Sequence, residues 1–571
     1  MTRLNQPDDN AATTETVRPT ADSEGVQEAR EVSAGDPQNG DQPKAVNAKE
    51  VIKFVTDHYE LRKTNEDELI GVALEGVPST WPLGGAKFAK KVARDFSRAE
   101  HLGRIPSKTV MERALGIIEA DAEERPPEKV HLRSAPYRGG YLIDLGRDDY
   151  RAVSVNEAGW KRLKLNVDHP LFKREGAQVS PLPAPGKKGP SPLADPDAPW
   201  RTYASLLGFD YDSHEFAVVR GWLCCVYMSN INRPLLWLDG PPGSSKTGRA
   251  ELIVAAVDPR MDHSLAAAPT GDTESNRVAA SASYVVAYDN VSHLKAGISN
   301  FLCTMVTGET TTRRKRYHDK ELSTISLHRT GVVTGLSLPT SLEDDALTRI
   351  AEVRVGSLDD AAKLGMVQLR REFAALHPAL FEAILDAMVT ALRKRYTATA
   401  PAIPTRFVEY CELLNALDHA GSDGGQYFQG ASLLEAYLSA GKDEMSDRAT
   451  EDPLVCLLAG MMATGSEDID GFTDSGYKGY PAPLREALEQ QLLGESGLKF
   501  KLTANDVLGH AGWFPDNASA LGRKLGKIDP LLRAVGIIVV RPPRNTRGAQ
   551  IVITMNPKLF DKSLWVRRSM R

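Results

Sequence analysis

A short apolar run, Pro234 to Asp239, leads into the glycine-rich turn GPPGSS, and Lys246 and Thr247 follow that turn directly. The next residues, Gly248 to Val257, have the composition of a helix. A strand, a glycine-rich turn, Lys-Thr and a helix in this order form the context of a phosphate-binding loop. Backbone N–H groups of such a loop and of the helix N-terminus point at phosphate oxygens. The sequence therefore predicts an α/β unit with a phosphate site at the end of this strand.

The side chains of the turn indicate what each position contributes. Lys246 would bring a positive charge to the β- and γ-phosphates, and the Thr247 hydroxyl would coordinate Mg²⁺. Ser245 stands where the pattern has its second glycine, and we expect it to keep φ negative while Gly243 supplies a free hinge. The predicted cofactors are ATP and Mg²⁺, and the predicted ATP-binding residues are Gly240, Pro241, Pro242, Gly243, Ser244, Ser245, Lys246 and Thr247.

A second apolar run, Ser283 to Asp289, ends in a carboxylate about forty residues after the turn. We expect Asp289 to hold Mg²⁺, directly or through water. Asn290 occupies the position where a second acid would orient the attacking water, and an amide cannot act as a base. Thr334 ends a third apolar run, where a sensor residue would touch the γ-phosphate. These residues favour nucleotide binding more strongly than rapid hydrolysis.

Two β-prone runs between 309 and 327 flank a short polar turn and predict a hairpin. Neighbouring like charges repel unless a negative group lies nearby, so DNA phosphate is the simplest explanation for the cations on it. They could instead meet the ATP of a neighbouring subunit or face solvent. The candidate DNA-binding residues here are Arg313, Arg314, Lys315, Arg316, His318 and Lys320.

Arg349 lies just before a further strand-like run. A cation at a subunit edge can stabilise charge on the transferred phosphate, as an arginine finger does. A surface ion pair is the alternative reading of the same residue.

The C-terminal region has a helix, helix, helix, strand, strand order that is typical of a winged helix. Its predicted helices lie at 481–493, 503–511 and 517–535, the third interrupted near Asp529 and Pro530, and its predicted strands lie at 536–540 and 550–554. Winged helices bind DNA or other proteins, and the basic loop between the strands favours DNA. The candidate contacts are Arg523, Lys524 and Lys527 on the third helix and Arg541, Arg544 and Arg547 on the wing.

The remaining features bound the class of protein. A length of 571 residues allows three or four domains. No apolar run is long enough to span a bilayer, and the N-terminus has no signal-peptide pattern, so we expect a soluble, cytoplasmic protein without a membrane partner. Five cysteines form neither a disulfide framework nor a metal-binding spacing. Apolar residues recur at helix spacing over 49–122 and at every second position in 131–165, which predicts helices and then a small β unit.

The motifs GPPGSSKT, VVAYDNVSH, TGETTTRRKRYHDKE, GVVTGLS and DDALTRIAEVRV, in this order, resemble those of superfamily 3-like AAA+ ATPases. Among these, the chain resembles the primase-helicase type of phages, plasmids and integrated elements, particularly the actinobacterial ATP-binding proteins. The resemblance runs from about 131 to 557 and is strongest over 237–355. It implies that Lys246 and Thr247 bind phosphate and Mg²⁺, that Asp289 holds the metal, that Arg349 is the finger and that the basic hairpin grips DNA in a central pore. Ser245 and Thr334 depart from the family pattern.

The fold class that follows is an α/β P-loop AAA+ core with helical N-terminal and lid regions and a C-terminal winged-helix domain. We predict a disordered acidic tail at 1–46, an N-terminal α+β domain and linker at 47–190, and the ATPase core at 191–360. A helical lid or collar follows at 361–465, then the winged helix at 466–557 and a basic tail at 558–571. Neither the length nor a pair of acids before Trp200 suits a fused primase domain.

The predicted function is an ATP-dependent DNA helicase or replication-initiation ATPase of a phage or mobile element. Its catalytic candidates are Lys246, Asp289, Asn290, Thr334 and Arg349. A finger acting on a neighbouring subunit implies a homo-oligomer, expected to be a hexameric ring on DNA, with a separate primase or other replication proteins as further partners. Two alternatives remain open. One is an ATP-switched DNA-binding regulator with little hydrolysis, and the other is a defence or partner-recruiting ATPase whose winged helix binds protein.

Overall fold

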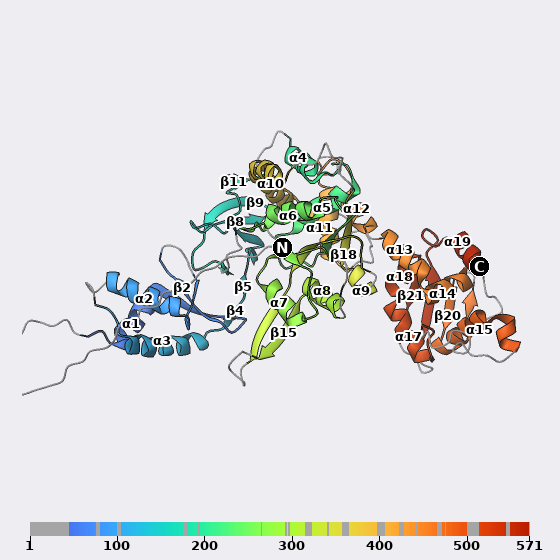
Figure 1. Ribbon diagram of the computed structural model, residues 1–571, viewed down its shortest axis with the longest axis horizontal. Coiled ribbons are helices and arrows are strands. Elements are labelled where there is room, and N and C mark those ends of the chain that lie inside the picture. The colour runs from blue at the N-terminus through green and yellow to red at the C-terminus, as the bar shows by residue number, and fades with distance from the viewer. Residues whose placement is uncertain are drawn as a thin grey trace, which may run out of the picture. The chain divides into compact units, whose positions relative to one another are not determined.

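The computed structural model describes residues 45–569 apart from 76–79, 100–103, 175–179, 191–194, 264, 292–293, 295–296, 315–321, 340–341, 357–364, 397–405, 422–426, 441, 465–470, 474–475, 500–512 and 544–548. The predicted tail at 1–46 therefore lies almost wholly outside the described residues. Three large apolar cores organise the described part of the chain (Figure 1). They run from Val51 to Ala122, from Tyr141 to Tyr437 and from Ala449 to Trp565.

The N-terminal module combines three helices with a four-stranded sheet in the order β3-β2-β1-β4. Its elements are α1 (Ala48–His58), β1 (Tyr59–Thr64), β2 (Leu69–Ala73), β3 (Thr80–Pro82), α2 (Ala86–Ala99), α3 (Lys108–Glu123) and β4 (Pro127–Glu128). The helical prediction for 49–122 is correct at the helices and wrong between 59 and 82. There, buried Tyr59 and Leu61 alternate with the less buried Glu60 and Arg62, which is strand periodicity. The run is short and half charged, so hydropathy alone did not distinguish it from a helix.

The β unit predicted over 131–165 is confirmed. Its five-stranded antiparallel sheet has the order β11-β9-β8-β7-β6, and β5 pairs with β10 beside it. The strands are β5 (Val130–His131), β6 (Ser134–Tyr137), β7 (Gly140–Asp144), β8 (Arg151–Asn156), β9 (Gly159–Lys164), β10 (Leu171–Phe172) and β11 (Lys188–Gly189).

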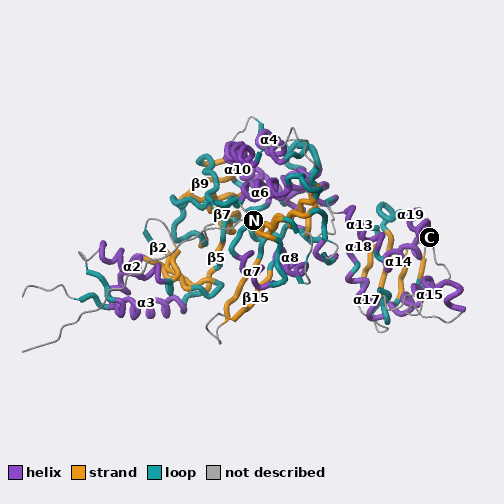
Figure 2. The backbone as a smooth tube through the Cα atoms, in the orientation of Figure 1, coloured by secondary structure: helices purple, strands orange, loops and turns teal. Residues whose placement is uncertain are grey.

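The central core is a parallel five-stranded sheet in the order β13-β14-β17-β12-β18. Two helices precede it in the chain, and the second is buried along its length. Figure 2 shows the helices that surround these strands. The elements are α4 (Ala198–Leu207), α5 (His214–Cys225), β12 (Leu235–Asp239), α6 (Lys246–Val257), β13 (Ala266–Ala267), α7 (Thr273–Ser281), β14 (Val285–Asp289), α8 (Ile298–Thr307), β15 (Glu309–Arg314), β16 (Leu322–Leu327), β17 (Thr330–Gly335), α9 (Asp344–Leu347) and β18 (Ile350–Arg354).

Helices follow the sheet, as the sequence predicts. They are α10 (Met366–Lys394), α11 (Val408–Asp418) and α12 (Leu433–Ser439). By length and composition α10 could cross a membrane, and it is the one described helix that could. Its apolar side chains are instead buried in the central core, where α10 packs against α4, α6 and α11.

The C-terminal core surrounds a four-stranded antiparallel sheet in the order β19-β20-β22-β21. The helix predicted at 503–511 lies outside the described residues, and the helix predicted at 517–535 divides into α17 and α18. The elements are α13 (Lys442–Glu451), α14 (Pro453–Thr464), β19 (Phe472–Thr473), β20 (Gly476–Gly479), α15 (Pro481–Lys499), α17 (Ala518–Lys527), α18 (Asp529–Ala534), β21 (Ile537–Val540), β22 (Ile551–Met555) and α19 (Lys562–Ser569).

A buried ion pair joins the β unit to the central sheet. Arg133, just before β6, donates from Nε to Asp258 Oδ1 at 3.1 Å, and its Nη2 lies 3.1 Å from the same oxygen. Asp258 Oδ2 accepts the N–H of Val285 at 3.2 Å. Both charged residues are more than nine-tenths buried. The carboxylate thus fixes the end of α6 and the start of β14 against the β unit.

We expect Arg133→Met to lower the free energy of unfolding of this core by about 3–5 kcal/mol, because it leaves a buried carboxylate without its cation. Thermal and urea unfolding followed by tryptophan fluorescence would measure the change. Lys53→Met is the matched control, because Lys53 pairs with Asp57 at 2.6 Å on the exposed face of α1, where a pair contributes about 0–1 kcal/mol. Equal losses for both variants would contradict the role given to Arg133.

Candidate phosphate-binding site

The glycine-rich turn sits at the carboxyl end of β12, the strand between β17 and β18. Gly240 has φ +155°, and a Cβ there would lie 2.3 Å from the carbonyl oxygen of Val355 at the end of β18, so the close approach of the two segments requires glycine. Gly243 has φ +80°, which confirms its expected freedom. The turn is thereby folded back onto the sheet edge, and α6 begins immediately after it.

Ser245 adopts the left-handed conformation, with φ +60° and ψ +27°, so the expectation of a negative φ is wrong. The turn geometry that normally requires glycine is kept, and serine carries its strain, about 1–2 kcal/mol for a residue with a Cβ. Ser245 is also the N-cap of α6, and its side chain makes no capping hydrogen bond. The first N–H groups of α6 are therefore left without a side-chain partner, which suits an anion.

The Lys246 ammonium group is folded into the turn. Its Nζ donates to the carbonyl oxygens of Gly240 at 2.7 Å and Pro241 at 2.8 Å, and to Ser244 Oγ at 3.3 Å. Partial burial lowers the pKa of Lys246, and the nearby carboxylates of Asp239 and Asp289 oppose that shift. The cation is held where a phosphate bound in the turn would meet it.

The carboxylate of Asp289, at the end of β14, is the centre of the site. Thr247 Oγ1 donates to its two oxygens at 3.0 and 3.2 Å, and Thr334 Oγ1 donates to Oδ1 at 2.5 Å. Thr334 Oγ1 also accepts the backbone N–H of Asn290 at 2.9 Å. Thr334 is buried and has its hydroxyl committed to Asp289, so it positions the carboxylate rather than reaching outward.

These side chains meet because β17 lies between β12 and β14 in a parallel sheet. The carboxyl ends of all three strands reach one edge, where ligands bind in open α/β sheets. Asn290 follows at this edge with φ +55°, and its side chain is exposed. The structure thus brings together Lys246, Thr247, Asp289, Asn290 and Thr334.

The oxygen set fits Mg²⁺. A hydroxyl and a carboxylate within hydrogen-bond distance are hard ligands, and Mg²⁺ usually takes one or two protein ligands together with phosphate oxygens and water. Among the described residues no group of three or more His, Cys, Asp or Glu could hold a metal by itself. Thr247 and Asp289 would therefore share the ion with the nucleotide.

Arg349 is separate from this cluster. It is only 8% exposed, and its Nη1 donates to Asp345 Oδ2 at 2.5 Å and to the Asp345 carbonyl at 2.7 Å. Arg406 contacts the other oxygen of the same carboxylate. Arg349 therefore forms an ion pair with a half-exposed carboxylate of its own chain, as the alternative reading expects, and none of its described partners belongs to the phosphate site.

The predicted basic hairpin is confirmed in its backbone. β15 and β16 pair antiparallel from Glu309 with Leu327 to Arg314 with Leu322. Figure 1 shows β15 near α7 and α8, and β16 packs against α7. Arg313 and Arg314 lie on β15, whereas Lys315, Arg316, His318 and Lys320 lie outside the described residues.

Three of the predicted C-terminal DNA contacts that the structure describes lie on one helix. Arg523, Lys524 and Lys527 lie on α17, and Arg541, at the end of β21, donates to the Gly522 carbonyl at 2.7 Å. Gly526 lies one helical turn after Gly522. Because it has no side chain, it leaves room for the guanidinium group of Arg541. Arg544 and Arg547 lie outside the described residues.

Sequence reasoning missed Arg249, in the first turns of α6. Its guanidinium lies 5.0 Å from the ring centre of Phe209, and Nη2 donates to the Gly356 carbonyl at 3.4 Å. Burial lowers the pKa of Arg249 to about 10. The only signal in the sequence was that Arg249 follows Lys246 by three residues. Its partners, Phe209 and Gly356, are remote in sequence.

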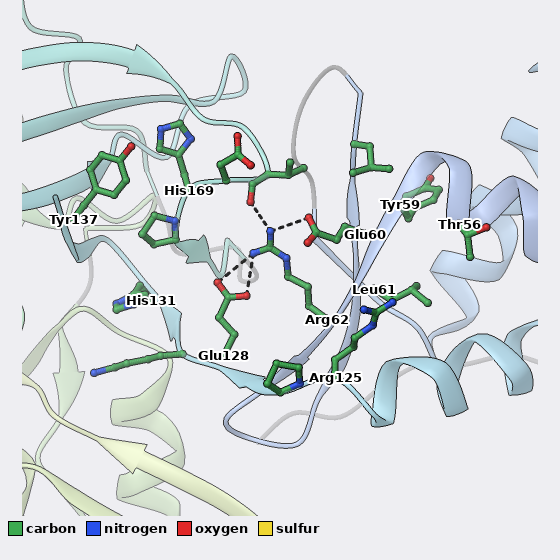
Figure 3. Close-up of a pocket in the computed structure, with 16 residues that line it drawn as sticks. Thr56, Tyr59, Glu60, Leu61, Arg62, Arg125, Glu128, His131, Tyr137 and His169 are labelled. Atoms are coloured by element: carbon green, nitrogen blue, oxygen red, sulfur yellow. Dashed lines mark hydrogen bonds and ion pairs between the residues drawn. The ribbon is translucent and has the colours of Figure 1, made fainter.

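A cavity of about 820 Å³ lies away from the phosphate loop, between the N-terminal module and the β unit (Figure 3). Arg62 crosses it and donates to Glu128 at 3.0 Å, to Glu60 at 2.9 Å and to the carbonyl of Val167. None of the predicted site residues lines it. The hydrogen bonds and ion pairs of Arg62 therefore link the walls of this cavity.

The central region of the chain is similar to a known protein family. Residues 204–440 match the family model described as "Actinomycete integrative conjugative element replication protein". This region resembles those replication proteins. The match contains the phosphate loop, Asp289, Thr334, the basic hairpin and Arg349, and it ends after α12. No curated protein matches the sequence.

Solved structures give weaker likenesses. The NrS-1 C-terminal region is 12% identical, with 90% of this chain and 100% of that chain covered and a TM-score of 0.35. A structure described as "SCCmec type IV Cch - active helicase" is 11% identical, with 87% and 93% covered and a TM-score of 0.37. JCV helicase is 14% identical, with 39% and 61% covered and a TM-score of 0.21. These TM-scores are too low to establish a shared fold.

We expect Ser245→Gly to keep or raise the melting temperature, because glycine removes the left-handed strain at the cost of about 0.5–1 kcal/mol of extra chain entropy. Ser245→Val should lower it by several degrees, because a β-branched residue fits φ +60° poorly. Differential scanning calorimetry of the two variants measures both effects. Equal melting temperatures would show that residue 245 does not hold this conformation.

Proposed function

We propose that this protein is an ATP-hydrolysing DNA motor of helicase type that acts in the replication of a mobile element. The observation that carries the proposal is the Thr247–Asp289–Thr334 cluster beside Lys246 at one edge of a parallel sheet. The similarity of 204–440 to replication proteins of integrative conjugative elements supports the biological setting. Within P-loop proteins, we assign the core to the superfamily 3-like AAA+ ATPases.

Each residue then has a role in phosphoryl transfer. The N–H groups of the turn and of α6 bind the phosphates, and Lys246 leaves the carbonyls of Gly240 and Pro241 to neutralise them. Mg²⁺, when bound, would offset charge on the β- and γ-phosphates, with Thr247 and Asp289 as its protein ligands. Thr334 fixes the carboxylate, and Asn290 would orient the attacking water without removing its proton.

The motor requires neighbouring subunits. Arg349 is held by Asp345 in its own chain, so we assign it to the ATP of an adjacent subunit after release from that carboxylate. This arrangement implies a homo-oligomeric ring, with six subunits as the expected number. The basic hairpin of β15 and β16 would contact DNA phosphate in the central channel, and a separate primase would supply primers.

The C-terminal region is proposed as a winged-helix domain that binds DNA. The described elements run β20, α15, α17, α18, β21 and β22 along the chain, and β20, β22 and β21 pair in one sheet. The exposed cations on α17 support contact with DNA phosphate.

A second candidate is a DNA-binding regulator switched by ATP with slow hydrolysis. Two residues favour the regulator. The amide of Asn290 cannot accept a proton from the attacking water, and Ser245 holds the loop in a strained conformation. It predicts DNA affinity that depends on ATP, without strand separation.

The deciding measurement is ATP turnover by the wild type and by Lys246→Ala, each with and without single-stranded DNA. The motor predicts turnover that DNA stimulates and that falls by a factor of about 10³ or more in the variant, because the charge opposite the β- and γ-phosphates is lost. Tight ATP binding with negligible turnover in the wild type would refute the motor and support the regulator.

Thr334→Val should weaken Mg²⁺-dependent nucleotide binding or turnover by about 10–100-fold, because Asp289 loses its buried donor and the Asn290 N–H its acceptor. Thr334→Ser keeps both hydrogen bonds and is the matched control. A Mg²⁺ titration of ATP turnover and of nucleotide affinity compares the two. The role of Thr334 is refuted if valine and serine behave alike.

A further inference from the structure

A row of cations runs along α2 in the N-terminal module, a region that the proposed ATPase site does not use. The residues are separated by three, four and four positions, so they lie on one face of the helix. All four are exposed, and the row is about 16 Å long from the first to the last Cα. They are Lys87, Lys90, Arg94 and Arg98.

Few acidic side chains neutralise the positive charge of α2. Asp95 is the one acid in α2, and it is shared by Lys91 at 2.7 Å and Arg94 at 2.9 Å. Lys87, Lys90 and Arg98 make no ion pair with any acid that the structure describes. Five cations against one carboxylate on a single helix, in a chain of net charge −5, indicate a surface that meets an external polyanion.

The opposite face of α2 excludes insertion of this helix into a bilayer. Phe88, Val92 and Phe96 are completely buried in the N-terminal core, where Phe88 packs against Tyr59 and Phe96 against Phe54. A helix that inserts into a bilayer needs its apolar face free to enter it. The buried face instead makes α2 a rigid support that presents its cations in a fixed line.

We infer that the cation row of α2 binds the phosphate backbone of duplex DNA, independently of the hairpin and of the C-terminal region. The inference takes DNA from the proposed function and assigns the N-terminal module the role of a DNA-docking domain. Lysine and arginine side chains in such a row contact phosphate groups and not base edges. This contact would therefore position the protein on DNA without selecting a base sequence. A rigid row of about 16 Å spans several phosphates of a duplex, which carries one charge per about 1.7 Å of axis.

The test is the affinity of the full chain for a duplex oligonucleotide, measured by fluorescence anisotropy without nucleotide between 50 and 200 mM salt. The variant is Lys87→Gln/Lys90→Gln/Arg98→Gln, which keeps good helix-forming residues. Removing three phosphate contacts should weaken binding by about tenfold or more and make the slope of log K against log salt shallower by about 2.7.

The matched control is Lys49→Gln/Lys108→Gln/Arg113→Gln, which removes the same charge from exposed positions on α1 and α3 of the same module. It should change affinity and slope little. Melting curves of both variants check that the module stays folded, since all six residues are exposed.

Equal losses in the two triple variants would overturn the inference, because net charge and not the row on α2 would then determine binding. Unchanged duplex affinity in the α2 variant would also overturn it, and a loss confined to single-stranded DNA or RNA would assign the row to that polymer instead. These outcomes are separate from failure of the motor, which is measured as ATP turnover, whereas this binding is measured without ATP.

Discussion

The carboxylate of Asp289 is the interaction on which the candidate site depends. It accepts hydrogen bonds from Thr247, which follows the glycine-rich turn, and from Thr334, which lies on the intervening strand. One group thereby links the ends of β12, β14 and β17. Since the hydroxyl of Thr334 is buried, the position of the carboxylate is set from inside the sheet and not by solvent.

The turn itself is held by contacts that a bound phosphate would replace. Lys246 donates to three oxygens of its own loop, so its charge is near the phosphate position before any ligand arrives. Gly240 lets the loop approach the end of β18, and Ser245 accepts a left-handed conformation to complete it. Ser245 is strained and does not cap α6 with its side chain. The N–H groups at the start of α6 are therefore suited to donate to a bound phosphate.

Other parts of the chain carry positive charge that the candidate phosphate site does not use. The basic hairpin, the cations of α17 and the row on α2 lie on three different elements, each supported by pairing or by a buried apolar face. Arg349 differs from them, because it is buried and neutralised by Asp345 within its own chain. A role for it at another subunit's ATP would require that pair to open.

The sequence by itself determined the phosphate loop, the strand that ends at Asp289, the hairpin and the small β unit. Each of these depends on residues close together in the chain, whose spacing fixes local geometry. Only the tertiary structure decided that β17 lies between β12 and β14, that Thr334 turns to Asp289 and that Asp345 holds Arg349. Parallel strand order and side-chain partners depend on hydrogen bonds and packing between distant segments, and no local pattern contains them. The positive φ of Ser245 has the same origin, since the loop must meet both the sheet edge and α6, and that constraint outweighs the preference of serine.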